Sequence, residues 1–176
     1  MEWMPIGYLP SLLAPWEKYA HFRSRDECEE NPEFRQIIPY TYLQNADGRV
    51  AMYSRRSAHT EGRLANLASI GIGGHIDISD MRETLQETVE HAQMRELLEE
   101  TGIPGFYRGQ VMGVLTLSGS MVNKVHVGVV FRLVTSILPS STEEIEAFKW
   151  FDSTTYQREQ KWEDWSHVLL QNLPES

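Results

Sequence analysis

Three glutamates near the middle of the chain have the residue type and the spacing of a metal site. They belong to the run Arg95-Glu96-Leu97-Leu98-Glu99-Glu100-Thr101-Gly102-Ile103. If this run is helical, Glu96, Glu99 and Glu100 stand at positions i, i+3 and i+4 and share one face. Carboxylates crowded on one face repel one another unless a cation compensates them, and such oxygen ligands suit Mg²⁺ or Mn²⁺. The spacing therefore predicts a divalent-cation site, although a solvated acidic helix face has the same composition.

A glycine-rich segment before this run favours the metal site. Gly71, Gly73 and Gly74 lie in the sequence Gly-Ile-Gly-Gly-His. Glycine allows a main chain to approach a metal or a phosphate closely. A glycine turn, followed by a helix that ends in an acidic run and then Gly-Ile, is more specific than any of these parts alone.

The element that must carry the acidic run is a helix predicted over residues 83–101. Gly102 is a suitable C-terminal stop, and Asp80 or Thr84 is the expected N-terminal cap. An apolar stripe at helical spacing is expected to face the core and comprises Leu85, Val89, Ala92, Leu97 and Leu98.

Strand-forming segments surround this helix. The turn sequence Asn45-Ala46-Asp47-Gly48 separates two of them and predicts a hairpin. Pro39, inside the first strand of that hairpin, predicts an edge strand or a bulge. A C-terminal helix is predicted over residues 159–173. The predicted strands cover residues 36–44, 49–56, 68–77, 110–119, 124–136 and 144–152. The order of strands, helix, strands and helix predicts an α/β fold in the form of an α+β sandwich, with a mixed β-sheet packed between helices.

Length and composition limit the organisation of the chain. Its 176 residues suit one domain, which we place at residues 35–176 after an N-terminal extension at residues 1–34. Aromatic residues of the extension are expected to pack on the domain or on a second subunit, which leaves both a monomer and a homodimer open.

The N-terminus does not resemble a signal peptide, and no apolar stretch is long enough for a bilayer, so we expect a cytoplasmic protein without a membrane partner. A net charge of −9 disfavours duplex nucleic acid as a partner, whereas a small phosphorylated substrate remains compatible when a cation screens its charge.

The acidic run resembles the conserved box of the Nudix (MutT-like) hydrolase family. That box consists of Gly, five residues, Glu, seven residues, Arg-Glu, an aliphatic residue, any residue, Glu-Glu, any residue, Gly and an aliphatic residue. Residues 95–103 match its second half at every fixed position, and Glu87 stands where the first glutamate belongs. The glycine departs from the pattern, because the box would place it at Met81, whereas Gly74 lies seven residues upstream. An insertion of seven residues accounts for the shift, and counting forward from Gly74 makes Asp80 the first acid instead.

The wider resemblance covers about residues 35–165 and implies a Nudix fold. The sequences Gly-Ile-Gly-Gly-His and Val-His-Val-Gly-Val-Val are similar to a bacterial or phage subgroup described as phosphoesterase-like. The family resemblance implies a metal-dependent hydrolase, a pyrophosphatase acting on a nucleoside diphosphate derivative or a nucleoside triphosphate.

The resemblance also implies roles for single residues at the metal site. Glu96, Glu99 and Glu100 would bind Mg²⁺ or Mn²⁺ together with a main-chain carbonyl at Gly73 or Gly74, and Glu99 or Glu100 would orient or deprotonate the attacking water. Arg95 would pair with Glu87 or Asp80 and hold the loop on the helix.

Other side chains are candidates for catalysis or substrate contact. A later loop would supply a further acid as base or metal ligand, for which Glu144 is the candidate, flanked by Glu143 and Glu146. Arg56, Arg63 and His75 are candidates for phosphate or substrate contacts.

Two other functions share this fold. A non-catalytic module that senses a nucleotide or a protein partner is one, although a pure binding module has no need of three clustered carboxylates. An isopentenyl diphosphate isomerase is the other, but its chemistry needs an active-site cysteine, and the single cysteine, Cys28, lies outside the predicted domain.

Overall fold

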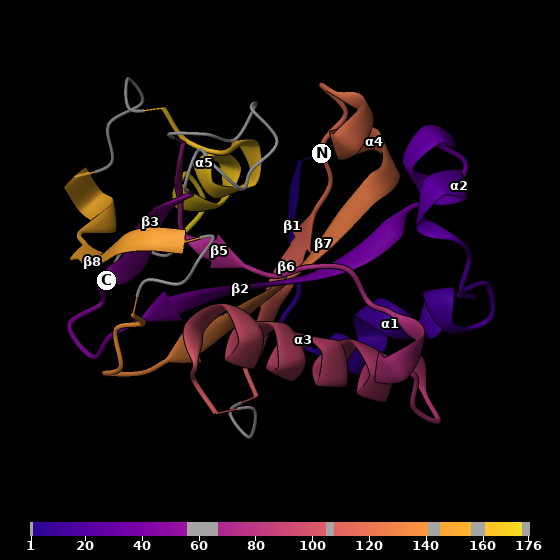
Figure 1. The fold of residues 1–176 in the computed structure, drawn as a ribbon, viewed down its shortest axis with the longest axis horizontal. Coiled ribbons are helices and arrows are strands. Elements are labelled where there is room, and N and C mark those ends of the chain that lie inside the picture. Colours follow the sequence, from indigo (N-terminus) through magenta and orange to yellow (C-terminus); the bar gives the residue numbers. More distant parts are fainter. Residues whose placement is uncertain (1, 56–66, 105–107, 141–144, 156–160, 174–176) are drawn as a thin grey trace.

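The computed structural model describes residues 2–55, 67–104, 108–140, 145–155 and 161–173, and these residues form one mixed sheet with helices on both faces (Figure 1). The strand order is β1-β6-β7-β2-β3-β4, with β5 beside β2 and β8 beside β3. The strands are β1 (Trp3–Pro5), β2 (Gln36–Gln44), β3 (Val50–Arg55), β4 (Ala68–Ser69), β5 (Gly71–Ile72), β6 (Gln110–Leu115), β7 (His126–Val134) and β8 (Ile145–Phe151). The predicted class, a mixed sheet packed between helices, is confirmed.

Two parallel strands form the centre of this sheet. β2 pairs with β7 from Gln36 opposite His126 to Gln44 opposite Val134, so both strands start at the same edge. β5 pairs with the other side of β2 only at Thr41 and Tyr42. Pro39 therefore lies inside a central strand and not at the edge of the sheet, which corrects the prediction. A residue without an N–H is tolerated there because β5 leaves this side of β2 uncovered.

Helices cover the two faces of the sheet. The helices α1 (Leu9–Glu17) and α3 (Leu85–Thr101) lie on one face, where Leu13, Val89 and Val129 belong to a shared core. Helix α5 (Asp164–Leu170) covers the other face with Trp165 and Leu169. Short elements complete the description, namely α2 (Arg25–Glu30), α4 (Met121–Val125) and the 3₁₀ turns η1 (Ile78–Asp80) and η2 (Ser153–Thr155). No helix among the described residues is both long enough and apolar enough to span a membrane.

The N-terminal extension packs on the domain. Its strand β1 pairs antiparallel with β6, where Trp3 stands opposite Leu115. Trp3 packs against the core under α5, and Trp16 packs against the core under α1 and α3. Tyr8 and Tyr19 are exposed. The extension thus adds an edge strand and a covering helix to the sheet.

Helix α3 agrees closely with the prediction and differs at one apolar position. Thr84 is its N-cap, and Gly102 ends it in the left-handed conformation with a φ of 70°. Leu97 is 1% exposed and belongs to the core, but Leu98 is 48% exposed. The prediction for Leu98 was wrong because consecutive helical residues point about 100° apart, and the sheet covers only the direction of Leu97.

Several local assignments from the sequence need correction. The strand predicted over residues 68–77 is divided into β4 and β5 and ends at Ile72. The strand predicted from residue 124 begins at His126, because Ser120 caps the short helix α4 just before it. The C-terminal helix begins at Asp164, later than predicted, because Trp162 lies outside it and bridges to Ala68 in parallel orientation.

Candidate functional site

The three glutamates of the acidic run lie on the last two turns of α3. Glu96 is 13% exposed and Glu99 is 57% exposed at the side chain, and Glu100 is half-buried. The C-terminal end of a helix carries a partial negative charge, which adds to the mutual repulsion of these carboxylates. The arrangement is therefore unfavourable without a cation.

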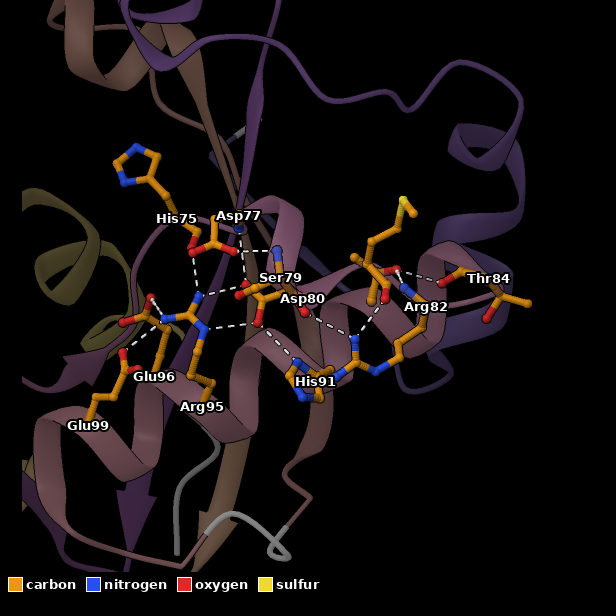
Figure 2. Close-up of polar contacts among 12 residues, drawn as sticks. His75, Asp77, Ser79, Asp80, Arg82, Thr84, His91, Arg95, Glu96 and Glu99 are labelled. Carbon is orange, nitrogen blue, oxygen red and sulfur yellow. Dashed lines mark hydrogen bonds and ion pairs between the residues drawn. The ribbon is translucent and has the colours of Figure 1, made fainter.

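Arg95 supplies a positive charge to two of these carboxylates (Figure 2). Its Nη1 atom lies 2.8 Å from Glu96 Oε1 and 2.9 Å from Glu99 Oε2. The described residues contain no group of three or more His, Cys, Asp and Glu side chains already arranged to hold a metal ion. The two carboxylates nonetheless converge on a single cationic nitrogen, so their oxygens can share one positive centre.

Asp80 fixes the guanidinium of Arg95 from the opposite side. Arg95 donates from Nε to Asp80 Oδ1 at 2.9 Å and from Nη2 to Asp80 Oδ2 at 2.6 Å, a bidentate geometry of high specificity. The Nη2 atom also donates to the His75 carbonyl at 3.0 Å. Asp80 is fully buried and further contacts His91 Nδ1 and the Asp77 N–H, each at 3.0 Å. This network ties the loop after β5 to the middle of α3.

The electrostatic environments of Asp80 and Glu96 differ. Burial acts to raise the pKa of Asp80, but hydrogen bonds from Arg95, the Asp77 N–H and His91 together hold that pKa below its usual value. Burial is also the main influence on Glu96, and there it raises the pKa despite the opposing hydrogen bond from Arg95. Glu96 is thus a carboxylate for which burial opposes the charged form and which a further cation would stabilise.

Glu87 has a different role from the one predicted. Its carboxylate accepts a hydrogen bond from the Thr84 N–H at 3.1 Å, and the Thr84 hydroxyl accepts one from the Glu87 N–H at 3.2 Å. The pair forms a capping box at the start of α3. The predicted ion pair between Glu87 and Arg95 is therefore wrong, because Asp80 takes the place of the box acid.

The position of the seven-residue insertion follows from this pairing. Gly74 and Asp80 keep the five intervening residues of the box, so the additional residues lie between Asp80 and Arg95. Seven residues correspond to about two helical turns. The segment from Asp80 to Arg95 contains the link after η1 and the first turns of α3.

The glycine segment packs directly against the acidic face. A Cβ atom at Gly74 would lie 2.6 Å from the Glu96 carboxylate, and one at Gly73 would lie 1.9 Å from the Pro39 carbonyl oxygen. A side chain at Gly73 would collide with the main chain of Pro39, which explains that glycine, whereas one at Gly74 would require the Glu96 carboxylate to move. The main chain at Gly74 thereby lies close to Glu96, and the role of its carbonyl as a metal ligand stays a prediction.

His75 follows Gly74 in the loop, and its ring points away from Arg95 and Glu96 (Figure 2). Its Nε2 atom lies 3.0 Å from His126 Nε2. Burial is the main cause that lowers the pKa of His75 to about 4, with the positive charge of Arg25 next. A contact between His75 and substrate stays a prediction. Glu144, Arg56 and Arg63 lie outside the described residues.

Two histidines of this region were missed as partners within the network. His91 contacts Asp80 across 11 positions in sequence, and His126 contacts His75 across 51. The helical spacing of His91 from Arg95 is a weak signal that it faces the same side. Nothing in the sequence pairs His126 with His75, because the parallel pairing of β2 with β7 brings them together.

Comparison with known proteins agrees with this geometry. The family model described as the NUDIX domain matches residues 35–173. The chain belongs to the Nudix family. Nudix hydrolases cleave pyrophosphate linkages in small phosphorylated substrates and generally use divalent ions such as Mg²⁺ or Mn²⁺. The resemblance inferred from the acidic run is thus confirmed.

Individual relatives extend the match beyond the Nudix domain model. Protein YmaB of Bacillus subtilis (strain 168) is 28% identical over 172 residues, which cover 92% of this chain and 82% of that protein. The crystal structure of Tm1382 has a TM-score of 0.72 at 25% identity and covers 98% of this chain and 90% of its own. The crystal structure of DR0079 from Deinococcus radiodurans has a TM-score of 0.61 at 14% identity, and the match covers 81% of this chain and 87% of that one, which shows a likeness of fold alone. Because the Tm1382 match covers nearly the whole chain, the extension before the Nudix domain is a shared part of that fold.

Proposed function

We propose that this chain is a metal-dependent diphosphohydrolase that acts on a nucleoside diphosphate derivative or a nucleoside triphosphate. One observation carries the proposal: Glu96 and Glu99 converge on a single cationic nitrogen beside the glycine loop. Membership of the Nudix family supports the reaction class. The proposal extends that class to a metal ion and a nucleotide substrate.

The residues present suit a hard divalent cation. Glu96, Glu99 and Glu100 would hold Mg²⁺ or Mn²⁺ together with the main-chain carbonyl of Gly74, because all four are oxygen donors. When bound, the ion supplies Lewis-acid polarisation of the diphosphate and lowers the pKa of a water molecule.

Arg95 can leave the glutamates without leaving the loop. Only its Nη1 atom contacts Glu96 and Glu99, whereas Nε and Nη2 hold Asp80. A small rotation of the guanidinium therefore frees two carboxylates while one hydrogen bond to Asp80 persists. In this proposal Arg95 neutralises the glutamates in the free protein and is displaced from them when the cation binds.

The reaction needs a group that takes a proton from the attacking water. Glu99 is exposed and Glu100 is half-buried on the same face, so either carboxylate accepts that proton as the water oxygen bonds to one phosphorus atom. The bond from that phosphorus to the bridging oxygen breaks, and the second phosphate leaves with the bridging oxygen. Glu144 remains a candidate for the same proton transfer, and Arg56 and Arg63 remain candidates for phosphate contacts.

The decisive experiment is a hydrolysis panel with Mg²⁺ or Mn²⁺. Candidate substrates are dNTPs, ADP-ribose, NADH, diadenosine polyphosphates, nucleotide sugars and isopentenyl diphosphate, with products resolved by chromatography. We expect cleavage of one nucleotide class that disappears with EDTA and in Glu100→Gln. Tight binding of a nucleotide without cleavage would contradict hydrolysis and favour the sensor alternative. Isomerisation of isopentenyl diphosphate would favour the isomerase.

A further inference from the structure

His126 contacts the loop of the acidic site through a chain of hydrogen bonds. It is the first residue of β7 and is buried. Its Nδ1 atom lies 2.7 Å from the Val122 carbonyl oxygen, and its Nε2 atom lies 3.0 Å from His75 Nε2 and 3.3 Å from the side-chain nitrogen of Gln36. A carbonyl oxygen only accepts, so Nδ1 of His126 carries a proton and donates it. The ring of His126 is thereby fixed in orientation by β2 and α4.

The contact between the two imidazoles is directional. One proton must lie between the two Nε2 atoms for a hydrogen bond to form. The ring planes are inclined at 67° with centroids 5.1 Å apart, so the rings meet edge to face rather than stacking. Because Nδ1 of the neutral His126 ring carries the proton, its Nε2 atom accepts, and His75 Nε2 donates.

His75 is consequently held at both its main chain and its side chain. Arg95 binds its carbonyl oxygen and His126 binds its ring. The residue before it, Gly74, lies so close to Glu96 that a Cβ there would be 2.6 Å from the Glu96 carboxylate. With His75 fixed at two points and Gly74 pressed against Glu96, the direction of the Gly74 carbonyl has little freedom.

We propose that His126 is a positioning residue, which acts through His75 to hold the main chain of Gly74 at the acidic face. This inference rests on the proposed function, because it assigns the Gly74 carbonyl to the cation site. His126 itself does not bind the cation in this scheme. Its removal lowers the affinity for Mn²⁺ and leaves the number of bound ions unchanged.

The test measures Mn²⁺ binding to the full chain by electron paramagnetic resonance of the free ion, without any substrate. His126→Phe and His75→Phe keep a ring of similar volume and remove the nitrogen atoms. We expect each to weaken Mn²⁺ binding about tenfold, the lower end for residues that orient metal ligands. The double variant is expected to be no weaker than the single ones, because both remove one shared contact. His126→Gln keeps a polar atom near the Nε2 position and is expected to recover most of the affinity.

Controls separate this inference from the proposed function. His21→Phe changes an exposed histidine of the extension and is expected to bind Mn²⁺ as the wild type does. Thermal unfolding shows which variants are folded, and His75→Phe, in a loop, provides the test if His126→Phe does not fold.

Wild-type affinity in both variants, while Glu96→Gln loses the ion, would overturn the role of His126 and leave the proposed function intact. Loss of one bound equivalent in His126→Phe would make histidine a ligand and overturn positioning. Mn²⁺ binding that Glu96→Gln leaves unchanged would overturn the cation site and this inference together.

Discussion

The two halves of the Nudix box in this chain are built in different ways. The second half, residues 95–103, is one continuous piece of helix whose carboxylates share a face through local geometry alone. The first half, residues 74–80, is a loop and a 3₁₀ turn held by contacts to a distant element, mainly Arg95 and His91 on α3. The helical half follows the family pattern at every fixed position, and the loop half keeps the spacing of the pattern but has Asp80 in place of its glutamate.

The difference shows where a sequence insertion is tolerated. The seven additional residues lie between Asp80 and Arg95, where the chain leaves η1 and begins α3. Within the loop half, Gly74 lies against Glu96 and Asp80 binds Arg95. The loop half keeps the spacing of the box, and the additional length follows it.

The largest expected effect concerns the helical half. Glu99→Gln and Glu100→Gln remove a carboxylate charge without changing shape, and we expect hydrolysis to fall about 10²–10⁴-fold. Unfolding temperatures should change little or rise, because repulsion on the face is reduced. Steady-state kinetics with the substrate from the panel measures the first effect, and calorimetry measures the second. Glu87→Gln, on the same helix, is the matched control and is expected to keep wild-type turnover. Full activity in both variants would refute the assigned metal ligands.

A second prediction concerns which acid belongs to the loop half. Asp80→Asn removes the buried partner of Arg95, and loss of one partner of a buried pair costs about 3 kcal/mol. Glu87→Gln keeps the ability to cap the helix and should cost about 0.5 kcal/mol or less. Urea denaturation of both variants gives the free energies of unfolding. If Glu87→Gln proves the more destabilising of the two, the assignment of Asp80 as the box acid is wrong.

A third prediction concerns the contact between the two halves. Gly74→Ala places a methyl group against the Glu96 carboxylate, 2.6 Å from it in the present geometry, so the loop or the carboxylate must move. We expect Mn²⁺ affinity to fall about tenfold, as measured by paramagnetic resonance. Gly7→Ala serves as the control, since a Cβ there meets nothing within 4 Å. Equal Mn²⁺ binding by the two variants would show that the closeness of Gly74 to Glu96 is not needed.

The smallest expected effect is a dependence of stability on pH. The folded-state pKa of Asp80 is held below its usual value by Arg95, the Asp77 N–H and His91. Its contribution to stability is therefore fully present above the pKa of the unfolded chain and disappears as the pH falls through the lower folded-state pKa. The difference in unfolding free energy between wild type and Asp80→Asn should accordingly shrink as urea titrations move from pH 7 to pH 3. A difference that stays constant over this range would mean that the charge of Asp80 does not stabilise the fold.

The sequence alone determined the acidic helix and its C-terminal end, and it left the N-cap open between Asp80 and Thr84. Residues 96, 99 and 100 share a face because of helical periodicity, and Thr84 and Gly102 cap the helix through local backbone chemistry. The first strand of the predicted hairpin was also placed correctly, since β2 covers residues 36–44 as predicted. These features depend on residues a few positions apart, so the sequence carries them directly.

The tertiary structure decided the features that join distant segments. It selected Asp80 over Glu87 as the partner of Arg95, turned Leu98 to solvent, and placed His126 against His75. For the partner of Arg95 and for the apolar stripe of α3, more than one residue satisfied the same local rule, and no local rule pairs His126 with His75. The choice among them depended on which one the sheet, the loop or a neighbouring strand reached, and long-range packing sets that distance.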